Sequence, residues 1–270
     1  RTDNAHYLSG EIRNSRFDDL IAVLNLQEHV VLDFSGVRRL DFFSAGQLVN
    51  RLSPFKANGK DGTVKLLEWL KARGEKIDHC VVGEPTSVGS VGDTLKIGRR
   101  GSINFRIAVR GTQGHVGYPQ KANNPIPVLA ELVTQLAGYR LDKGNAHFDP
   151  STLAFTTLDV GNAATNVIPG GAYAAFNIRF NDAHTPGSLV GWVNDRAERI
   201  AKESGCSITV THSVSGVSFL TQPGKFTQLI SDTVSRITGQ SPVFSTSGGT
   251  SDARFIKDHC PVVELGLAGA

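Results

Sequence analysis

Hydrophobic and polar positions follow two different periods between about residues 97 and 216. They alternate with a period of two over 102–110, 152–160, 172–180 and 206–214, which predicts strands. They recur every three or four residues over 125–141 and 186–204, which predicts helices that begin at a proline. The resulting order, β-α-β-β-α-β, is typical of a ferredoxin-like unit, a four-stranded antiparallel sheet with two helices on one face.

A second set of elements flanks this unit on both sides. We expect an amphipathic helix over 63–74, a buried strand over 79–83, a helix over 226–238 and a strand over 261–265. The sequence therefore predicts an α/β fold. One α/β domain is divided into 61–96 and 217–270, and the ferredoxin-like unit, 97–216, is inserted between its halves.

The first 60 residues have a pattern of their own. A short helical apolar stretch covers 20–26, a buried strand is expected over 29–34, and a second apolar segment covers 40–52. The sequence Asn58-Gly59-Lys60-Asp61-Gly62 predicts a turn, so we place a boundary after residue 60.

Composition narrows the class of protein. The chain has 270 residues, of which 40% are hydrophobic and 20% charged, so it can bury a core. No apolar run is long enough to span a bilayer, so membrane insertion is not indicated. The net charge is +3 and the basic residues are scattered along the chain, so nucleic-acid binding is not indicated. Three distant cysteines without a CxxC pair favour a reducing, cytoplasmic compartment. Met is absent even from position 1, and the chain stops soon after the strand expected over 261–265, so we expect a fragment at both ends.

Two charged residues are candidates for ligand binding in the flanking segments and at their junction with the insert. Glu84 follows a buried strand, where open α/β sheets place their ligands, although a loop or helix-capping glutamate is the alternative. Arg99 lies between glycines that would let an anion approach its guanidinium group. A solvated pair with Arg100 at a hinge is the alternative there.

Further candidates lie in and after the inserted unit. His115, between glycines, could donate a hydrogen bond to a developing oxyanion, or it could be an ordinary turn histidine. Asn166 and Arg179 could share one anion, or they could be a turn asparagine and a solvated strand arginine. The loop over 247–252, SGGTSD, offers amides and hydroxyls to an anion, which alone is a weak signal.

The order of these motifs carries a family resemblance. Eight short motifs occur in a fixed order over about 210 residues. They are GEPTS, IGRRGS, GTQGHVGYP, NNPI, ATNVIP, FNIRF, GGTSDARFI and VVELG. This series resembles bacterial succinyl-diaminopimelate desuccinylases, which belong to the di-zinc aminoacylase and carboxypeptidase family. The resemblance implies an α/β catalytic domain with an inserted ferredoxin-like lid that forms a homodimer. It also implies two zinc ions per subunit and a zinc-bound water that attacks an amide with a glutamate as general base.

The resemblance also implies roles for single residues. Glu84 matches a zinc ligand, and His115 matches a lid histidine that reaches the partner subunit's site and polarises the scissile carbonyl. The positions that match the substrate pocket and hold the succinyl end are Arg99, Tyr118, Asn166, Arg179, Thr250 and Ser251.

The chain departs from the family at its metal ligands. The family's His-x-Asp strand end, bridging Asp, Glu-Glu pair and C-terminal His have no counterpart in context, and His147-Phe148-Asp149 lies in the lid. Because a catalytic zinc takes three protein ligands, we expect this chain to lack hydrolase activity. Three functions stay open: a zinc hydrolase that removes the succinyl group from N-succinyl-LL-2,6-diaminopimelate in lysine biosynthesis, a related N-acyl-amino-acid deacylase, or a non-catalytic dimerisation or binding protein.

Residues 1–60 resemble another fold. The stretch VVLDFSGVRRLDFFSAGQLVNRL, 30–52, resembles the first part of a STAS domain of the anti-sigma-factor antagonist type. Ser44 matches the serine of that family, where a phosphate would lie at a helix N-terminus.

Overall fold

The computed structural model describes residues 5–12, 31–40, 60–249 and 251–268, and the chain divides into two compact units, 1–75 and 76–270. In the first unit, strands β1 (Ala5–Ile12) and β2 (Val31–Leu40) pair in parallel. A short π-helix, η3 (Lys60–Val64), leads into helix α3 (Lys65–Ala72). The expected helix over 20–26 and Ser44 lie outside the described residues, so the STAS-like interpretation stays a prediction.

Helix α3 confirms the helix expected over 63–74. Gly74 follows its last turn with a φ of 71°, a left-handed conformation that glycine adopts without steric cost. Leu67 is buried, but Leu66, which the pattern placed on the apolar side, is 54% exposed. Helix α3 falls in the first compact unit, which ends at Glu75, and the boundary expected after residue 60 stays a prediction.

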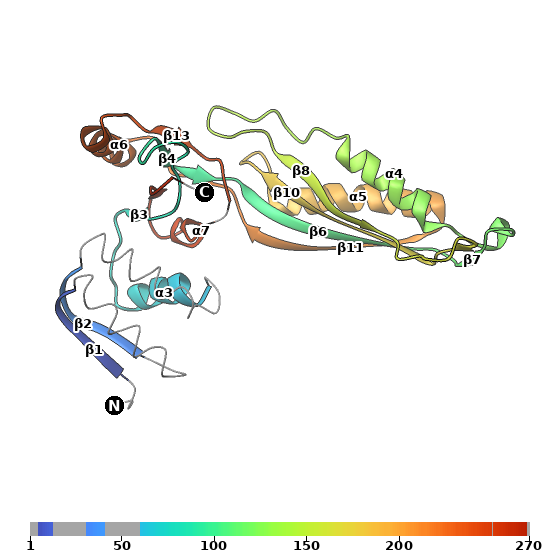
Figure 1. Ribbon diagram of the computed structural model, residues 1–270, viewed down its shortest axis with the longest axis horizontal. Helices are drawn as coiled ribbons and strands as arrows, with labels where there is room; N and C mark the ends of the chain where they lie inside the picture. Colours follow the sequence, from blue (N-terminus) through green and yellow to red (C-terminus); the bar gives the residue numbers. More distant parts are fainter. Residues whose placement is uncertain (1–4, 13–30, 41–59, 250, 269–270) are drawn as a thin grey trace. The chain divides into compact units, whose positions relative to one another are not determined.

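The second unit contains the expected β-α-β-β-α-β order (Figure 1). Four antiparallel strands lie in the order β11-β6-β10-β8, and helices α4 and α5 are the two crossovers. The bounds are β6 (Gly101–Arg110), α4 (Pro125–Ala137), β8 (Thr152–Asp159), β10 (Gly171–Phe180), α5 (Pro186–Ser204) and β11 (Ser207–Gly216). We call this part of the chain, 97–216, the lid.

Local sequence signals fix both lid helices. The Asn124 side chain accepts a hydrogen bond from the Ile126 amide at the start of α4. Thr185 and Ser188 form a capping box at the start of α5, and Gly205 ends that helix with a φ of 69°. The Asn124 and Thr185 side chains satisfy amides that the first turn of a helix leaves unpaired.

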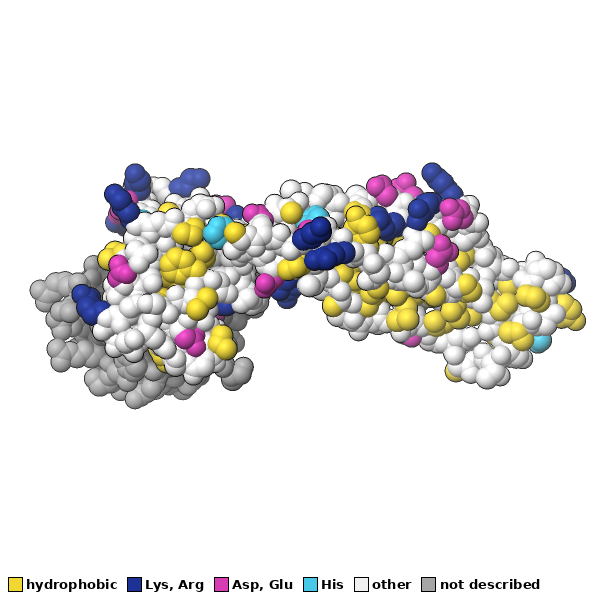
Figure 2. Space-filling view, turned by 90° about the horizontal axis from the view of Figure 1, so that it is seen from above, with side chains coloured by type: hydrophobic (Ala, Val, Ile, Leu, Met, Phe, Trp, Pro, Cys, Tyr) yellow, Lys and Arg dark blue, Asp and Glu magenta, His cyan; other side chains and the backbone are white. Residues whose placement is uncertain are grey.

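The two faces of the lid sheet differ in chemistry. The helices cover a face whose side chains include Phe105 and Phe176, with ring centroids 4.9 Å apart, and Leu132 of α4 packs into the same core. The opposite face carries polar side chains such as Asn104 and Asn177, which hydrogen-bond to each other at 2.8 Å. Figure 2, which views the molecule from above, shows hydrophobic side chains gathered along one side of the lid.

A second sheet is built from segments before and after the lid. Its order is β13-β4-β14-β3, and β14 runs parallel to β3 but antiparallel to β4. The bounds are β3 (Cys80–Val82), β4 (Thr94–Lys96), β13 (Val243–Ser245) and β14 (Val262–Glu264), with helices α6 (Lys225–Thr238) and α7 (Ala253–Ile256). The expected strands 79–83 and 261–265 and the helix over 226–238 are confirmed, whereas the sequence pattern did not indicate β4 or β13.

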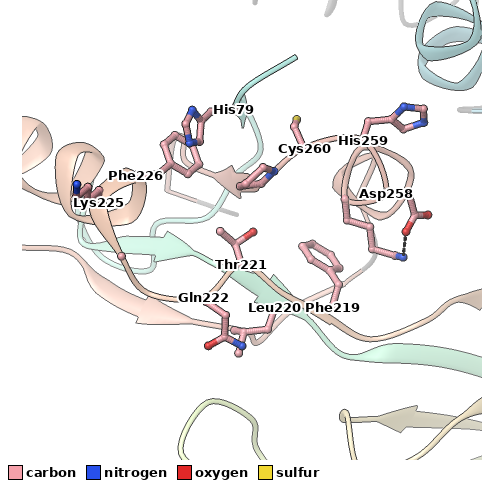
Figure 3. Close-up of a pocket in the computed structure, with 13 residues that line it drawn as sticks. His79, Phe219, Leu220, Thr221, Gln222, Lys225, Phe226, Asp258, His259 and Cys260 are labelled. Atoms are coloured by element: carbon pink, nitrogen blue, oxygen red, sulfur yellow. Dashed lines mark hydrogen bonds and ion pairs between the residues drawn. The ribbon is translucent and has the colours of Figure 1, made fainter. Parts of the chain in front are cut away.

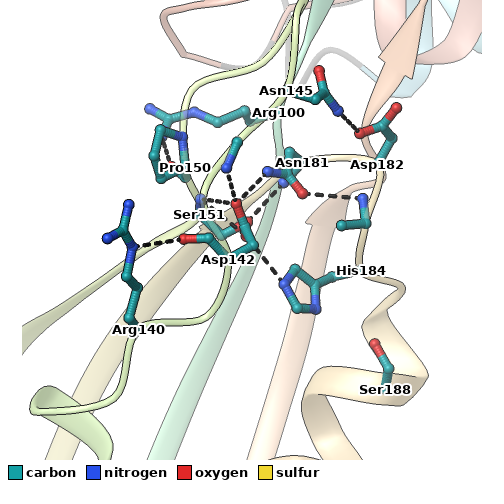
Figure 4. Close-up of polar contacts among 12 residues, drawn as sticks. Arg100, Arg140, Asp142, Asn145, Pro150, Ser151, Asn181, Asp182, His184 and Ser188 are labelled. Carbon is teal, nitrogen blue, oxygen red and sulfur yellow. Dashed lines mark hydrogen bonds and ion pairs between the residues drawn. The ribbon is translucent and has the colours of Figure 1, made fainter.

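Asp142 anchors the loop between α4 and β8 (Figure 4). Its carboxylate accepts hydrogen bonds from the Gly144 and Ser151 amides and from Asn181 Nδ2, and it lies 3.1 Å from His184 Nε2. Burial opposes ionisation of Asp142, but these hydrogen bonds outweigh it and lower its pKa to about 2. The same loop contacts the second sheet's segments, because Thr246 Oγ1 donates to the His147 carbonyl at 2.6 Å.

Candidate functional site

The carboxyl ends of the parallel strands β3 and β14 lie side by side. Glu84 follows β3 and is half-buried, and Gly266 follows β14. A Cβ on Gly266 would overlap the backbone carbonyl of Glu84, so the two segments approach closely only because this position is glycine. The structure thus places Glu84 at the edge of the sheet where α/β folds bind ligands.

Arg99 lies in strand β5 (Gly98–Arg99) and is buried. Its Nε and Nη2 groups donate to the carboxylate of Glu264, which is also buried, and its Nη1 group donates to the Gly249 carbonyl at 2.7 Å. Ser251 Oγ donates to the same carboxylate. Glu264 therefore neutralises Arg99, and the pair contacts the SGGTSD loop through Gly249 and Ser251.

The sequence analysis missed both Glu264 and Lys96. Lys96 is 7% exposed, and its Nζ donates to Ser245 Oγ at 3.1 Å and to Ser247 Oγ at 2.7 Å. Burial and the nearby charge of Arg99 lower the pKa of Lys96. VVELG contains Glu264, and Lys96 directly precedes IGRRGS, but nothing in the pattern of one strand reveals its partner in another.

His115, Tyr118 and Asn166 meet at the far tip of the lid. Strands β7 (Gly114–His115) and β9 (Val167–Ile168) pair there, and the Val116 amide donates to the Asn166 carbonyl at 3.0 Å. The rings of His115 and Tyr118 lie 6.0 Å apart. The Gly117 amide donates to His115 Nδ1 at 3.0 Å, so the neutral ring carries its proton on Nε2, and this N–H can donate to a ligand.

The candidate residues consequently occupy different ends of the lid. Arg179 lies near the end of β10 that adjoins Gly101, whereas β7 follows the other end of β6 (Figure 1). Ten strand residues separate these ends, which corresponds to roughly 30 Å. His115, Tyr118 and Asn166 at the tip are therefore too far from Arg99 to form one site with it within a single lid. Thr250 lies outside the described residues.

The residues present do not fit a two-zinc site. Among the described residues, no group of three His, Cys, Asp or Glu side chains is placed to hold a metal ion. Glu84 is the one candidate ligand from the sequence analysis, and a catalytic zinc takes three protein ligands. No chemical step through zinc follows from these residues alone.

A hollow of about 760 Å³ lies elsewhere (Figure 3). His79 and Pro261 line it, so it adjoins the amino ends of β3 and β14, opposite the edge that carries Glu84. Its floor and rim include Phe219, Leu220, Thr221, Lys225, Phe226, Lys257, Asp258, His259 and Cys260. None of the candidate residues from the sequence lines it.

Among the described helices, none is long and apolar enough to cross a bilayer.

Known proteins resemble the chain in sequence and in fold. Residues 97–205 match the family described as peptidase dimerisation domain. The chain is 55% identical over 214 residues to succinyl-diaminopimelate desuccinylase of Dinoroseobacter shibae, which covers 79% of this chain and 56% of that protein. The desuccinylase of Ruegeria pomeroyi is 53% identical over 209 residues, covering 77% of this chain and 55% of that protein.

Solved structures agree on the fold. Aminopeptidase PepT from Bacillus cereus gives a TM-score of 0.61 at 21% identity, covering 77% of this chain and 54% of that one. A tripeptidase from Staphylococcus aureus gives 0.61 at 20% identity, covering 77% of this chain and 53% of that one. The relatives named here are thus amide-bond hydrolases, and the chain spans about half the length of each.

Proposed function

We propose that residues 61–270 belong to a zinc-dependent deacylase of the desuccinylase family, whose substrate is N-succinyl-LL-2,6-diaminopimelate. The observation that carries this proposal is the 55% identity over 214 residues to a desuccinylase. The polar cluster around Arg99 and Ser251, and the position of Glu84 at the carboxyl edge of β3, support it. Residues 97–216 act as a ferredoxin-like lid, and 61–96 with 217–270 as parts of the catalytic domain.

The lid also pairs two copies of the chain. Its match to a peptidase dimerisation domain and its edge strand β8 support this part of the proposal. Because His115 lies at the tip, roughly 30 Å from the Arg99 end of the lid, it would serve the site of the partner subunit, with Nε2–H as the donor to the scissile carbonyl. Tyr118 and Asn166 would line the substrate pocket beside it.

The proposal is tested by completing the chain. Residues 61–270 would be joined to the amino-terminal part and the carboxyl-terminal end of the Dinoroseobacter shibae relative and assayed in zinc. We expect hydrolysis of the succinyl substrate and much slower hydrolysis of its N-acetyl counterpart, because arginine and asparagine side chains in the proposed pocket would favour a second carboxylate. Glu84→Gln should abolish activity. A folded, zinc-loaded chimera that does not hydrolyse the succinyl compound would refute the substrate assignment.

A second function suits the chain by itself. Since the described residues offer no group that could hold a metal, we propose that residues 1–270 alone lack hydrolase activity and act as a dimerising or binding protein. Analytical ultracentrifugation over a wide concentration range tests this. We expect a concentration-dependent dimer, and a monomer throughout would contradict it.

A further inference from the structure

A loop of the lid is bonded to the residue that leads into the SGGTSD loop. That residue is Thr246, which is buried and directly precedes Ser247, the first residue of the SGGTSD loop. Thr246 Oγ1 donates to the carbonyl of His147, in the lid loop over 142–151, at 2.6 Å. We call residues 142–151 the strap. A single hydrogen bond thus connects the strap to the start of the SGGTSD loop.

Both ends of the strap are fixed to the rest of the lid. Asp142, at one end, accepts hydrogen bonds from the Ser151 amide, at the other end, at 3.2 Å and from Asn181 Nδ2 at 2.7 Å (Figure 4). Arg100, which directly precedes β6, donates through Nη1 to the Pro150 carbonyl at 3.1 Å. Because its two ends are held together, the strap is a closed loop that follows the lid.

The tip of the strap is a hydrogen-bonded turn. Asn145 Oδ1 accepts from the amides of His147 at 2.9 Å and of Phe148 at 3.0 Å. The Asn145 amide donates to the Phe148 carbonyl at 2.9 Å, which closes the turn. The Phe148 side chain is 2% exposed, so its burial anchors the tip. The His147 carbonyl is therefore already in place as an acceptor for Thr246.

Two groups hold the segment 245–247 from opposite sides. Lys96 Nζ donates to Ser245 Oγ at 3.1 Å and to Ser247 Oγ at 2.7 Å. Side chains of neighbouring residues in an extended segment point in opposite directions, so Thr246 points away from Lys96 and towards the strap. Lys96 belongs to strand β4 of the second sheet, whereas His147 belongs to the lid. The sheet and the lid together therefore place the start of the SGGTSD loop.

We propose that the strap sets the position of the SGGTSD loop, and that Thr246 is the positioning residue that links them. A movement of the strap away from this segment leaves the buried Thr246 hydroxyl without its acceptor, which costs free energy, so the loop follows the strap. In the deacylase proposed above, whose substrate pocket includes Ser251 of this loop, the lid adjusts the pocket through Thr246. That consequence rests on the proposed function, whereas the link itself does not.

Residue-resolved amide hydrogen exchange of the full chain tests the link. Thr246→Val keeps the shape of the side chain but removes the hydroxyl. The amides of His147, Phe148 and Ser247 should then exchange ~5-fold faster, the factor expected for one lost hydrogen bond. Thr246→Ser keeps the hydroxyl and should leave these amides near their wild-type rates. Thr233→Val is the matched control, because the Thr233 hydroxyl donates to a carbonyl within α6, and it should change none of them.

A substitution in the strap tests the same link from its other end. Asn145→Ala opens the turn at the tip, and Asn145 is exposed, so the fold should persist. The Ser247 amide should again exchange ~5-fold faster, and Thr246→Val should add nothing further in the double variant, because the link is already broken. The link is overturned by an unchanged Ser247 amide in either single variant, by additive effects, or by a Thr246→Ser variant that behaves like Thr246→Val.

Kinetics of the zinc-loaded chimera separate this inference from the proposed function. Thr246→Val should lower kcat/KM by ~5-fold or more, and Thr246→Ser should keep it near the wild-type value, because only the hydroxyl holds the loop. An active chimera whose kcat/KM is unchanged by Thr246→Val would overturn the effect of the lid on the pocket alone. An inactive chimera, with the expected exchange rates in the full chain, would overturn the deacylase alone.

Discussion

Arg99 and Glu264 form a buried ion pair that joins strand β5 to strand β14, which lie 165 positions apart in the sequence. The Arg99 side chain is 10% exposed and that of Glu264 is 1% exposed. Ser251 donates to the same carboxylate, so this pair fixes the glycine loop that the sequence marked as an anion site. Arg99 thus supports the loop that carries Thr250 and Ser251.

Glu264→Gln should destabilise the second unit strongly. The substitution leaves the Arg99 cation buried without a counter-charge, which typically costs about 3–5 kcal/mol. Urea unfolding monitored by circular dichroism measures the loss. Asp258→Asn is the control, because Asp258 is 69% exposed in its pair with Lys257 and its loss should cost less than ~1 kcal/mol. Equal effects of the two substitutions would contradict the structural role of Arg99.

Asp142 should make stability depend on pH at the acid end. Its folded pKa of about 2 lies below the ordinary value of 3.8, so its contribution is fully present above pH 3.8 and is lost as the pH falls through about 2. Asp142→Asn removes this titration. The difference in unfolding free energy between wild type and variant should therefore shrink as the pH falls from about 4 towards 2, and a constant difference would refute the assignment.

Gly266→Ala should disturb the carboxyl edge that carries Glu84. The new methyl group would overlap the Glu84 carbonyl, so one of the two segments must move, and overpacking of this kind typically costs about 1–3 kcal/mol. Gly83→Ala is the matched control, because a Cβ there meets nothing within 4 Å. Thermal unfolding compares them, and the close approach of the two strands is disproved if Gly266→Ala is as stable as Gly83→Ala.

His115 should show one tautomer in its neutral form. Because the Gly117 amide donates to Nδ1, the ring proton belongs on Nε2. Nitrogen chemical shifts of the imidazole, recorded by long-range proton–nitrogen correlation, distinguish the two tautomers. A neutral ring with its proton on Nδ1 would mean that His115 presents an acceptor at the tip and cannot polarise a carbonyl.

The sequence predicted regular elements better than it predicted contacts between them. The period of α5 and its Thr185 and Gly205 caps are local signals, so its bounds match the predicted helix. Strand β4 has three residues, too few to show a period, and was missed. Glu264 and Lys96 were missed because their roles depend on partners more than 100 positions away, Arg99 in one case and Ser245 and Ser247 in the other.

The family resemblance found residues that period and spacing alone did not select. It identified Tyr118, which the structure places beside His115, although its role as a substrate-pocket residue stays a proposal. The resemblance could not indicate that Arg99 forms an ion pair with Glu264, because neighbouring positions in a motif do not reveal which side chains pair in the fold.

Zinc content tests most directly whether the chain by itself is a metal-dependent hydrolase. The purified chain would be dialysed against trace zinc and analysed for its metal by elemental analysis. With Glu84 as the one candidate ligand among the described residues, we predict close to no zinc per chain. Two zinc ions per chain would contradict this account, because the metal site of a deacylase would then be complete in this molecule.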